Sequence, residues 1–319
     1  MQKIYTMQEF IQLILTSGKS AVNLALYILL PVLVLMMGLM EIFVQRGLLY
    51  RVSRLLSPAL SIFGIPGIGI FAMLQILLVN FAAPLATFII MEKDGTISKR
   101  KIAATLAMVL TMSQANAVFP LAIVGLNVPI TILSSILGSI LAASATYYLF
   151  SKKSETPDNT TSELRLETTY EKKGLLKVFL EGGENGMQMA LKAIPILVFA
   201  IFIVNILKVV GAINVIQGWL SPLFQQFNLP SITILPILTK YLAGGTAMMG
   251  VTMDLIQKKM MTGLDLNRIA GFMINPLDMV GVAFFISAGP RVASVLKPAM
   301  LGAIIGILFR AVFHVVYFL

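Results

Sequence analysis

The residues best placed to do chemistry lie in the middle of an apolar run over residues 269–288, which is long enough to cross a bilayer. The sequence Asn275-Pro276-Leu277-Asp278 places an amide, a proline and a carboxyl where hydrocarbon would penalise all three. Pro276 also removes a backbone donor, which membranes tolerate only where protein or water satisfies the freed carbonyls. Because secondary transporters hold solutes at broken helices near the midplane, the pattern predicts a broken helix in which Asn275 and Asp278 face a cavity.

Three further apolar runs carry polar or glycine interruptions, at residues 80–84, 111–116 and 244–248. Their side chains could be donors and acceptors for a solute, or they could satisfy backbone groups freed by Pro84 and Pro276. The sequence leaves both interpretations open. The predicted solute-binding residues are Asn80, Thr111, Ser113, Gln114, Asn116, Lys240, Gly244, Gly245, Thr246, Asn275 and Asp278.

Asp278 carries the most weight in this set, because a carboxylate at mid-membrane costs about 2.5–3.5 kcal/mol on insertion scales. It is expected to bind a cation, a proton or a polar group of the solute. The alternative is a structural ion pair with Lys240, whose long side chain could also reach the membrane interface. Gly244 and Gly245 are expected to allow a tight turn or a close helix contact, since no P-loop lysine follows them.

The composition is that of a polytopic membrane protein: 58% of the 319 residues are hydrophobic and 12% are charged. Cysteine is absent, which excludes disulfides and thiolate sites, and the single His314 is expected at the membrane interface. We therefore expect no catalytic residues, no metal and no cofactor other than a coupling cation, Na⁺ or H⁺. The net charge of +10 comes from loops between apolar runs, so no nucleic-acid partner is expected.

The apolar runs predict an all-α fold. An interfacial helix over residues 6–18 precedes a spanning helix over residues 21–44, and a second interfacial helix follows over residues 45–60. Two interrupted segments, 66–91 and 102–124, lead to a spanning helix over residues 128–150. Residues 151–173 are polar and predict a cytoplasmic linker between a first repeat, 1–150, and a second repeat, 174–319.

The second half repeats the first at a constant offset of 164 residues. At this offset the break at Asn80 falls on Gly244, and the break at Thr111 falls on Asn275. The matched pairs include Pro31 with Pro195, Gly47 with Gly211, Pro58 with Pro222, Pro66 with Pro230, Gly125 with Gly289, and Gly138 with Gly302.

The distribution of positive charge favours inverted repeats over parallel ones. If residues 66–91 and 230–256 enter and return as hairpins, each repeat has three spanning helices and the two repeats are inverted. Fifteen of the 24 Lys and Arg residues then lie on the side of the linker and six on the other, as the positive-inside rule requires. The predicted fold is thus two inverted repeats, each with an interfacial helix, three spanning helices and a re-entrant hairpin.

The run Gly244-Gly245-Thr246-Ala247-Met248-Met249-Gly250, followed by Asn275-Pro276-Leu277-Asp278 in a doubled arrangement, resembles the nucleoside-recognition or Gate-domain membrane proteins. This group includes spore maturation proteins A and B, the membrane part of ferrous-iron transport protein B, and concentrative nucleoside transporters. The resemblance implies two re-entrant hairpins, each followed by a helix unwound at mid-membrane, with the solute held among all four.

The first-hairpin tip of the nucleoside transporters resembles a Gln-Thr-Glu-Ala-Pro-Leu string, which here reads Asn80-Phe81-Ala82-Ala83-Pro84-Leu85. Asn80 stands where the Gln would be, whereas Phe81 and Ala82 replace the Thr and the Glu. At these two positions the sequence departs from the string that the resemblance links to nucleoside recognition and to cation coupling through that Glu. The Asn-Glu pair of the second unwound helix is matched by Asn275 and, at a different spacing, by Asp278.

These features predict a transporter of a small polar solute, nucleoside-like or another metabolite, working by alternating access in the bacterial inner membrane. The alternative is a non-transporting membrane subunit of a partner-dependent, spore-maturation-like complex. The expected partners are the lipid bilayer and the solute, with assembly as a homo-oligomer also compatible with the sequence.

Overall fold

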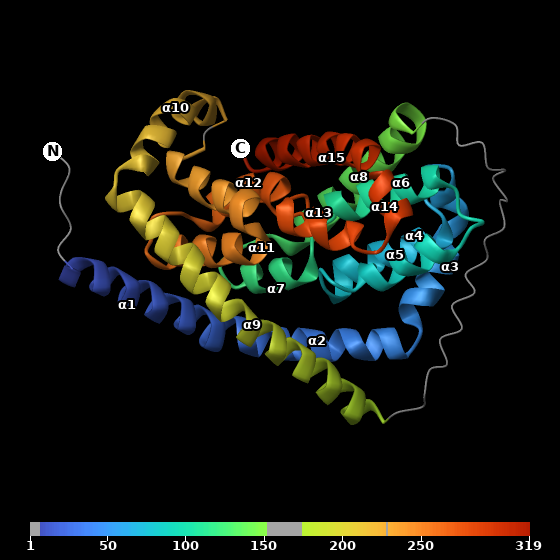
Figure 1. Cartoon of the computed structure of the whole chain (residues 1–319), viewed down its shortest axis with the longest axis horizontal. Coiled ribbons are helices and arrows are strands. Elements are labelled where there is room, and N and C mark those ends of the chain that lie inside the picture. The colour runs from blue at the N-terminus through green and yellow to red at the C-terminus, as the bar shows by residue number, and fades with distance from the viewer. Residues whose placement is uncertain (1–6, 152–173, 228) are drawn as a thin grey trace.

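The computed structural model describes residues 7–151, 174–227 and 229–319. Every regular element within these ranges is a helix, as predicted, and α1, α2 and α15 run roughly along the long axis while α9 crosses it diagonally (Figure 1). Apart from Ser151, the predicted linker lies outside the described residues, so the division into two repeats stays a prediction.

The described part of the chain begins with one continuous helix of 39 residues, Met7–Gln45. The predicted separation of an interfacial helix over residues 6–18 from a spanning helix is therefore wrong. A single Gly18 costs a helix only about 1 kcal/mol relative to alanine, and nothing else between the two runs ends it. The helix comprises α1 (Met7–Asn23), the π-helical η1 (Leu24–Leu29) and α2 (Leu30–Gln45).

The counterpart of this helix in the second half is α9 (Leu175–Val209), which packs along α2 (Figure 1). Glycines let the two backbones approach closely. A Cβ at Gly182 would lie 2.5 Å from the carbonyl oxygen of Met37, and one at Gly186 would collide with the carbonyl of Leu33. At 1.5 Å per residue both helices exceed the roughly 30 Å hydrocarbon core, so each must tilt or extend beyond it.

Two amphipathic helices correspond to the predicted interfacial elements, α3 (Leu48–Ser61) and α10 (Ala212–Gln226). Each follows a glycine with positive φ, Gly47 at 65° and Gly211 at 74°, a conformation that ends the preceding helix and turns the chain. The two helices lie toward opposite ends of the long axis (Figure 1).

The first predicted hairpin consists of two short helical arms that lie side by side. The hydroxyl of Thr87 in the second arm donates to Oε1 of Gln75 in the first at 2.7 Å. The arms are α4 (Gly67–Leu74) with the π-helical η2 (Gln75–Val79), and α5 (Pro84–Lys93).

The flanks of this hairpin come back to one place. Before the hairpin, the carbonyl of Ile62 accepts a hydrogen bond from the hydroxyl of Tyr148. After it, Nε of Arg100 donates to the carbonyl of Tyr147 at 2.6 Å, and the guanidinium lies 3.8 Å from the centre of that tyrosine ring. The segment therefore returns to the end of the molecule from which it left.

The second predicted hairpin is broken at one residue. The 3-10 turn η4 (Ser231–Thr233) leads into α11 (Ile234–Gln257), which is non-helical only at Gly244, where φ is 85° and ψ is 176°. Its flanks also converge, because Phe227 before it and Arg268 after it line one apolar groove beside Val316.

Each half then contains a helix broken in its middle. The first comprises α6 (Lys99–Thr111) and α7 (Ala115–Ala122), and the second comprises α12 (Gly263–Met273) and α13 (Met279–Ile286). Both α7 and α13 have eight residues and begin 164 positions apart. The remaining elements are α8 (Val128–Ala145), η3 (Thr146–Phe150), α14 (Pro290–Ser294) and α15 (Leu296–Tyr317).

Six helical stretches of the described chain are long and apolar enough to span a membrane. Three of them overlap the predicted segments 21–44, 102–124 and 128–150, and Ser231–Gln257 contains most of the predicted second hairpin. The apolar run 269–288 is not among the six, because residues 274–278 divide α12 from α13, whereas only residues 112–114 divide α6 from α7. That the halves are inverted with respect to a bilayer stays a prediction.

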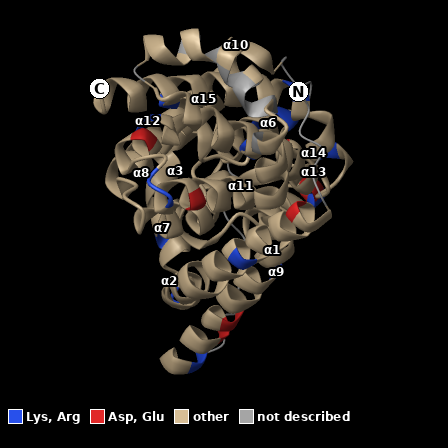
Figure 2. Ribbon diagram, turned by 90° about the vertical axis from the view of Figure 1, so that its left-hand side faces the viewer, with Lys and Arg blue, Asp and Glu red and all other residues tan. Residues whose placement is uncertain are grey.

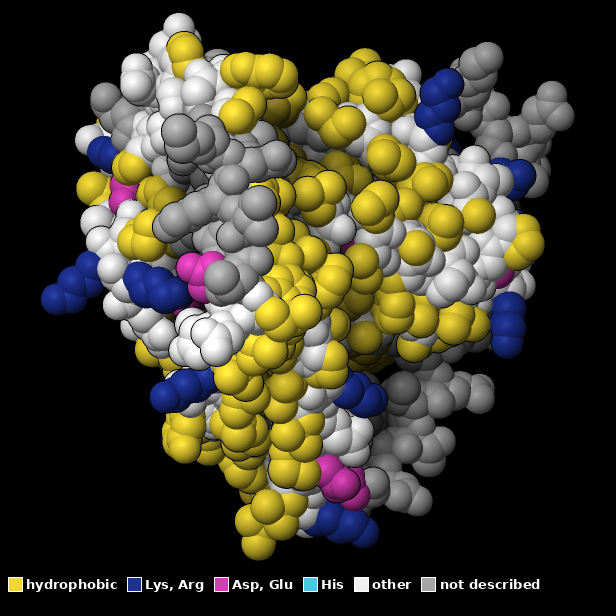
Figure 3. All heavy atoms as spheres, turned by 60° about the vertical axis from the view of Figure 1, so that its left-hand side comes forward, with side chains coloured by type: hydrophobic (Ala, Val, Ile, Leu, Met, Phe, Trp, Pro, Cys, Tyr) yellow, Lys and Arg dark blue, Asp and Glu magenta, His cyan; other side chains and the backbone are white. Residues whose placement is uncertain are grey.

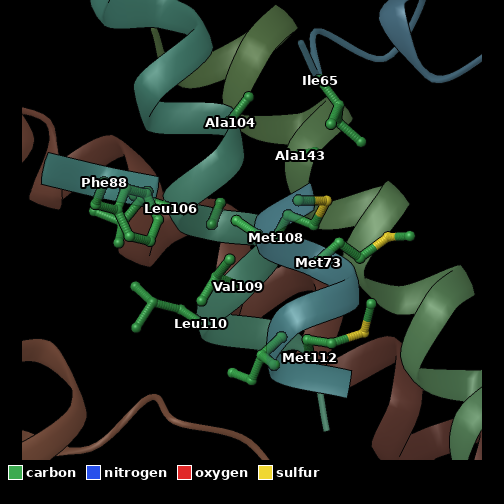
Figure 4. Packing of buried hydrophobic residues seen from close by; sticks show 14 of the residues in the cluster. Ile65, Met73, Phe88, Ala104, Leu106, Met108, Val109, Leu110, Met112 and Ala143 are labelled. Atoms are coloured by element: carbon green, nitrogen blue, oxygen red, sulfur yellow. The ribbon is translucent and has the colours of Figure 1, made fainter. Parts of the chain in front are cut away.

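The core of the bundle is built around α6, whose residues from Ile102 to Thr111 are all buried. Figure 4 shows Met108 of this helix beside Met73 of α4. Charged residues are sparse along the helices (Figure 2), and hydrophobic side chains cover much of the molecular surface in Figure 3. Such a surface suits a lipid bilayer.

Candidate functional site

The two broken helices meet directly at their breaks. Ser113 lies in the break between α6 and α7, and its hydroxyl donates to the carbonyl oxygen of Ile274, in the break between α12 and α13, at 3.3 Å. The backbone N–H of Ser113 donates to the hydroxyl of Ser135 in α8 at 2.6 Å. Segments 161 residues apart thus share one buried centre.

The tip of the first hairpin joins this centre through amide side chains. Oδ1 of Asn80 accepts from the N–H groups of Ala82 and Ala83 at 2.8 and 2.9 Å, which holds the turn that leads into α5. Oδ1 of Asn116 accepts from the N–H of Phe81 at 3.0 Å and so ties the tip to α7. Both amides satisfy backbone donors, the second of the two roles left open by the sequence.

Asn275 and Thr111 have the same kind of role. Oδ1 of Asn275 accepts from the N–H of Leu277 at 3.0 Å, and its Nδ2 donates to the carbonyl of Phe272 at 2.8 Å. The hydroxyl of Thr111 donates to the carbonyl of Ala107, one turn earlier in α6, at 2.8 Å. Each polar group thus compensates for a break in, or the end of, its own helix.

Gln114 differs from these residues. It is almost completely buried, and its Nε2 lies so close to Gly245 that a Cβ at that glycine would collide with it. Its side chain makes no hydrogen bond to the residues that the structure describes. The Gln114 amide, pressed against the break of the second hairpin, is therefore uncommitted, and half-buried Thr246 lies one residue further along.

Lys240 and Asp278 form a buried ion pair across the centre. Nζ of Lys240, in the first arm of α11, contacts Oδ2 of Asp278, and the two side chains are 0% and 4% exposed. Oδ1 of Asp278 accepts from the N–H of Gly281 at 2.7 Å, which caps α13. Lys240 therefore does not extend to the membrane interface. In this conformation Asp278 forms the ion pair with Lys240 that the sequence left open as the alternative to a solute contact.

Arg310 is a member of this centre that the site prediction missed. It lies in α15, is fully buried, and its Nη1 donates to the carbonyls of Thr111 and, at 3.0 Å, of Ile274. Its Nη2 donates to the hydroxyl of Ser113 at 2.6 Å. A charged residue inside the final apolar run was the available signal, because intramembrane ionisable residues are functional or structural centres by default.

His314, one turn further along α15, is fully buried rather than interfacial, so that prediction is wrong. Its Nε2 is 2.8 Å from the hydroxyl of Ser134, and its Nδ1 is 2.6 Å from the carbonyl oxygen of Asn267. The ring fills a contact between α8, α12 and α15. Among the described residues, no three His, Asp or Glu side chains gather into a group that could hold a metal ion.

A cavity of about 560 Å³ opens beside the ion pair, between α13 and α15. Asp278 and Tyr241 are its polar residues, and the rest of the wall is apolar. Most of the wall is formed by Phe272, Leu277, Met279, Val282, Met300, Ile304, Ile307 and Leu308.

No protein-family model matches the chain. Spore maturation protein B of Bacillus subtilis (strain 168) is 30% identical over 135 residues, which cover 40% of this chain and 74% of that protein. The chain belongs to the spore maturation protein B family. As the resemblance implied, it is a nucleoside-recognition, or Gate-type, membrane protein.

Solved structures of the concentrative nucleoside transporter CNTnw share the fold of this family member. An outward-facing double mutant gives a TM-score of 0.65 at 14% identity and covers 99% of this chain and 88% of its own. The inward-facing, substrate-bound protein gives 0.67 at 13% identity, covering 99% and 86%. The hairpin and broken-helix arrangement is therefore that of a transporter fold.

Proposed function

We propose that this protein is a transporter that carries a small solute across the membrane by alternating access. The observation that carries the proposal is the convergence of two hairpin tips and two broken helices on one buried centre. Gln114 and Gly245 bring together the first broken helix and the second hairpin, and Lys240 and Asp278 join that hairpin to the second broken helix. Broken helices that meet at mid-membrane are the usual solute sites of secondary transporters.

The groups that remain for a solute favour a molecule with a small polar part on a less polar body. Most of the predicted amides already bind backbone, which leaves the Gln114 amide and the Lys240–Asp278 pair. Tyr241, whose hydroxyl donates to the carbonyl of Phe272 at 3.4 Å, lines the adjacent cavity. The adjacent cavity is otherwise apolar. A nucleoside-like metabolite, which combines a flat base with hydroxyl groups, has this character. The Bacillus relative supports the cytoplasmic membrane of a bacterium as the location.

A second candidate is a non-transporting subunit that acts with a partner protein. It is favoured by the relative that is 30% identical, whose name describes a role in spore maturation and does not mention transport. A subunit that serves only as a scaffold gains nothing from an uncommitted amide and an ion pair buried at the helix breaks, which is why we place transport first.

The deciding experiment is solute uptake by the purified protein in liposomes, screened with nucleosides and other small metabolites under imposed ion gradients. The matched control is Lys240→Met combined with Asp278→Asn, which removes both charges without leaving either one unpaired. We expect uptake by the native protein and none by the double variant. Absence of both uptake and thermal stabilisation across the panel would contradict transport and favour the partner-dependent subunit.

A further inference from the structure

Arg310 lies where the C-terminal ends of two helices meet in one buried space. Helix α6 ends at Thr111 and α12 ends at Met273, and the last carbonyls of a helix have no partners within it. The negative ends of two helix dipoles therefore point into one buried space. Broken transporter helices commonly satisfy such carbonyls with a bound Na⁺ or a proton.

We propose that the Arg310 guanidinium takes the place of a coupling cation at this junction, so that the native protein requires no alkali cation there. Its Nη atoms bind the carbonyl oxygens of Thr111 and Ile274 and the Ser113 hydroxyl, three uncharged oxygens from both broken helices. Three neutral oxygens at helix C-termini form a site for a cation, and here the chain supplies that cation itself.

The residues around Arg310 accommodate both its charge and its side chain. No carboxylate lies within 4 Å of its guanidinium among the described residues, so the two helix ends are what offset the buried charge. Gly138 of α8 leaves room for the side chain, because a Cβ there would lie 2.5 Å from Cγ of Arg310. The backbone carbonyl of Arg310 in turn lies against Gly271 of α12.

The inference is independent of the transport proposal, because its test measures thermal stability and needs no solute. Thermal unfolding in detergent would be followed by far-UV circular dichroism for the native protein and for Arg310→Ala. Each would be measured in NaCl and in N-methylglucamine chloride of equal ionic strength, and with millimolar guanidinium or urea. Urea has nearly the shape of guanidinium but no charge, so it separates the filling of space from the supply of charge.

We expect Arg310→Ala to lower the Tm by several degrees, and guanidinium, but not urea, to restore part of that loss. Na⁺ should stabilise this variant more than N-methylglucamine does, because water and a small cation can enter the vacated space. The native protein should respond to neither additive nor to the exchange of cations. A residue that only packs would not make stability depend on the identity of the cation.

Arg291→Ala is the matched control, because Arg291 also donates to backbone carbonyls, those of Met91, Glu92, Asp94 and Ile97, but is only half-buried. Water can replace its bonds, so guanidinium should not rescue it. If Arg310→Ala does not fold, Arg310→Lys should melt above Arg310→Gln, since only the lysine keeps the charge. The proposal is overturned by equal melting of those two variants, by equal effects of guanidinium and urea, or by Na⁺-specific stabilisation of the native protein.

Discussion

At the scale of single residues, the Lys240–Asp278 pair couples stability to the candidate site. Both side chains are buried, so loss of one partner leaves an uncompensated charge. Asp278 also caps α13, but asparagine can accept the same hydrogen bond from Gly281. The charge and the cap can therefore be separated by substitution.

We expect Asp278→Asn to destabilise the protein by about 3–5 kcal/mol, the usual cost of breaking a buried pair. Adding Lys240→Met should recover most of that stability while solute binding stays lost. Chemical unfolding and solute binding would be measured on the same preparations. Full solute binding by the double variant would remove Asp278 from the site and leave it as a structural partner only.

Gln114 and Asn116 offer a second test at this scale, because they lie two residues apart and differ in their hydrogen bonds. Asn116→Ala removes the acceptor of the Phe81 N–H and should cost about 1–3 kcal/mol. Gln114→Ala removes an uncommitted amide and should change stability less, but should weaken solute binding. Equal losses of stability in the two variants would show that Gln114 has a structural role as well.

The positions of the breaks were predictable from the sequence, because proline and polar residues inside an apolar run are penalised unless something satisfies them. The roles of the individual amides were not. Whether Asn80 or Gln114 faces backbone or open space depends on a rotamer and on a neighbour contributed by another segment. Arg310 was missed for a related reason, since its partners Thr111 and Ile274 lie 199 and 36 residues away.

At the scale of elements, the two hairpins turn differently. The first has a tip of several residues, held by Asn80 and Asn116, whereas the second turns at Gly244 alone. The φ of 85° and ψ of 176° at Gly244 lie in a region that is essentially restricted to glycine.

Gly244→Ala should therefore destabilise the protein by about 1–3 kcal/mol through backbone strain. The matched control is Gly95→Ala, because Gly95 is exposed and a Cβ there would meet nothing within 4 Å. Thermal unfolding of the two variants against the native protein is the measurement. A Gly244→Ala protein as stable as the control variant would show that the break does not require this conformation.

Most elements followed from hydrophobic runs, glycines and prolines, but the joined helix over residues 7–45 did not. Its first part is amphipathic and its second part is apolar, and each pattern taken alone predicts a separate helix. Its packing against α9 runs along α2 and α1 alike, and tertiary contact of this kind overrides a local change in polarity.

At the scale of the whole molecule, the arrangement of the hairpins predicts which loops share a side of the membrane. Because the protein has no cysteine, single cysteines can be introduced at exposed Arg54, Lys93 and Lys258 without a background to remove. With the linker cytoplasmic, positions 54 and 93 should be labelled from the cytoplasmic side and position 258 from the other. Labelling of 54 and 93 from opposite sides would contradict the re-entrant hairpin.

The two hairpins are fastened by different chemistry. Near its tip the first is held by uncharged hydrogen bonds of Gln75, Asn80 and Asn116, and the second is held by the ion pair of Lys240 and Asp278. If each tip opens in turn during transport, opening the first breaks no ion pair, whereas opening the second draws a cation away from an anion.

Displacement of a unit charge through the membrane field is worth about 2.3 kcal/mol per 100 mV, in proportion to the fraction of the field crossed. The resting voltage of the cell would therefore bias the opening of the second tip and leave that of the uncharged first tip unaffected. Exchange through such a protein would pass more readily in one direction of the voltage than in the other, although no helix within residues 7–151, 174–227 and 229–319 carries the row of arginines that marks a dedicated voltage sensor.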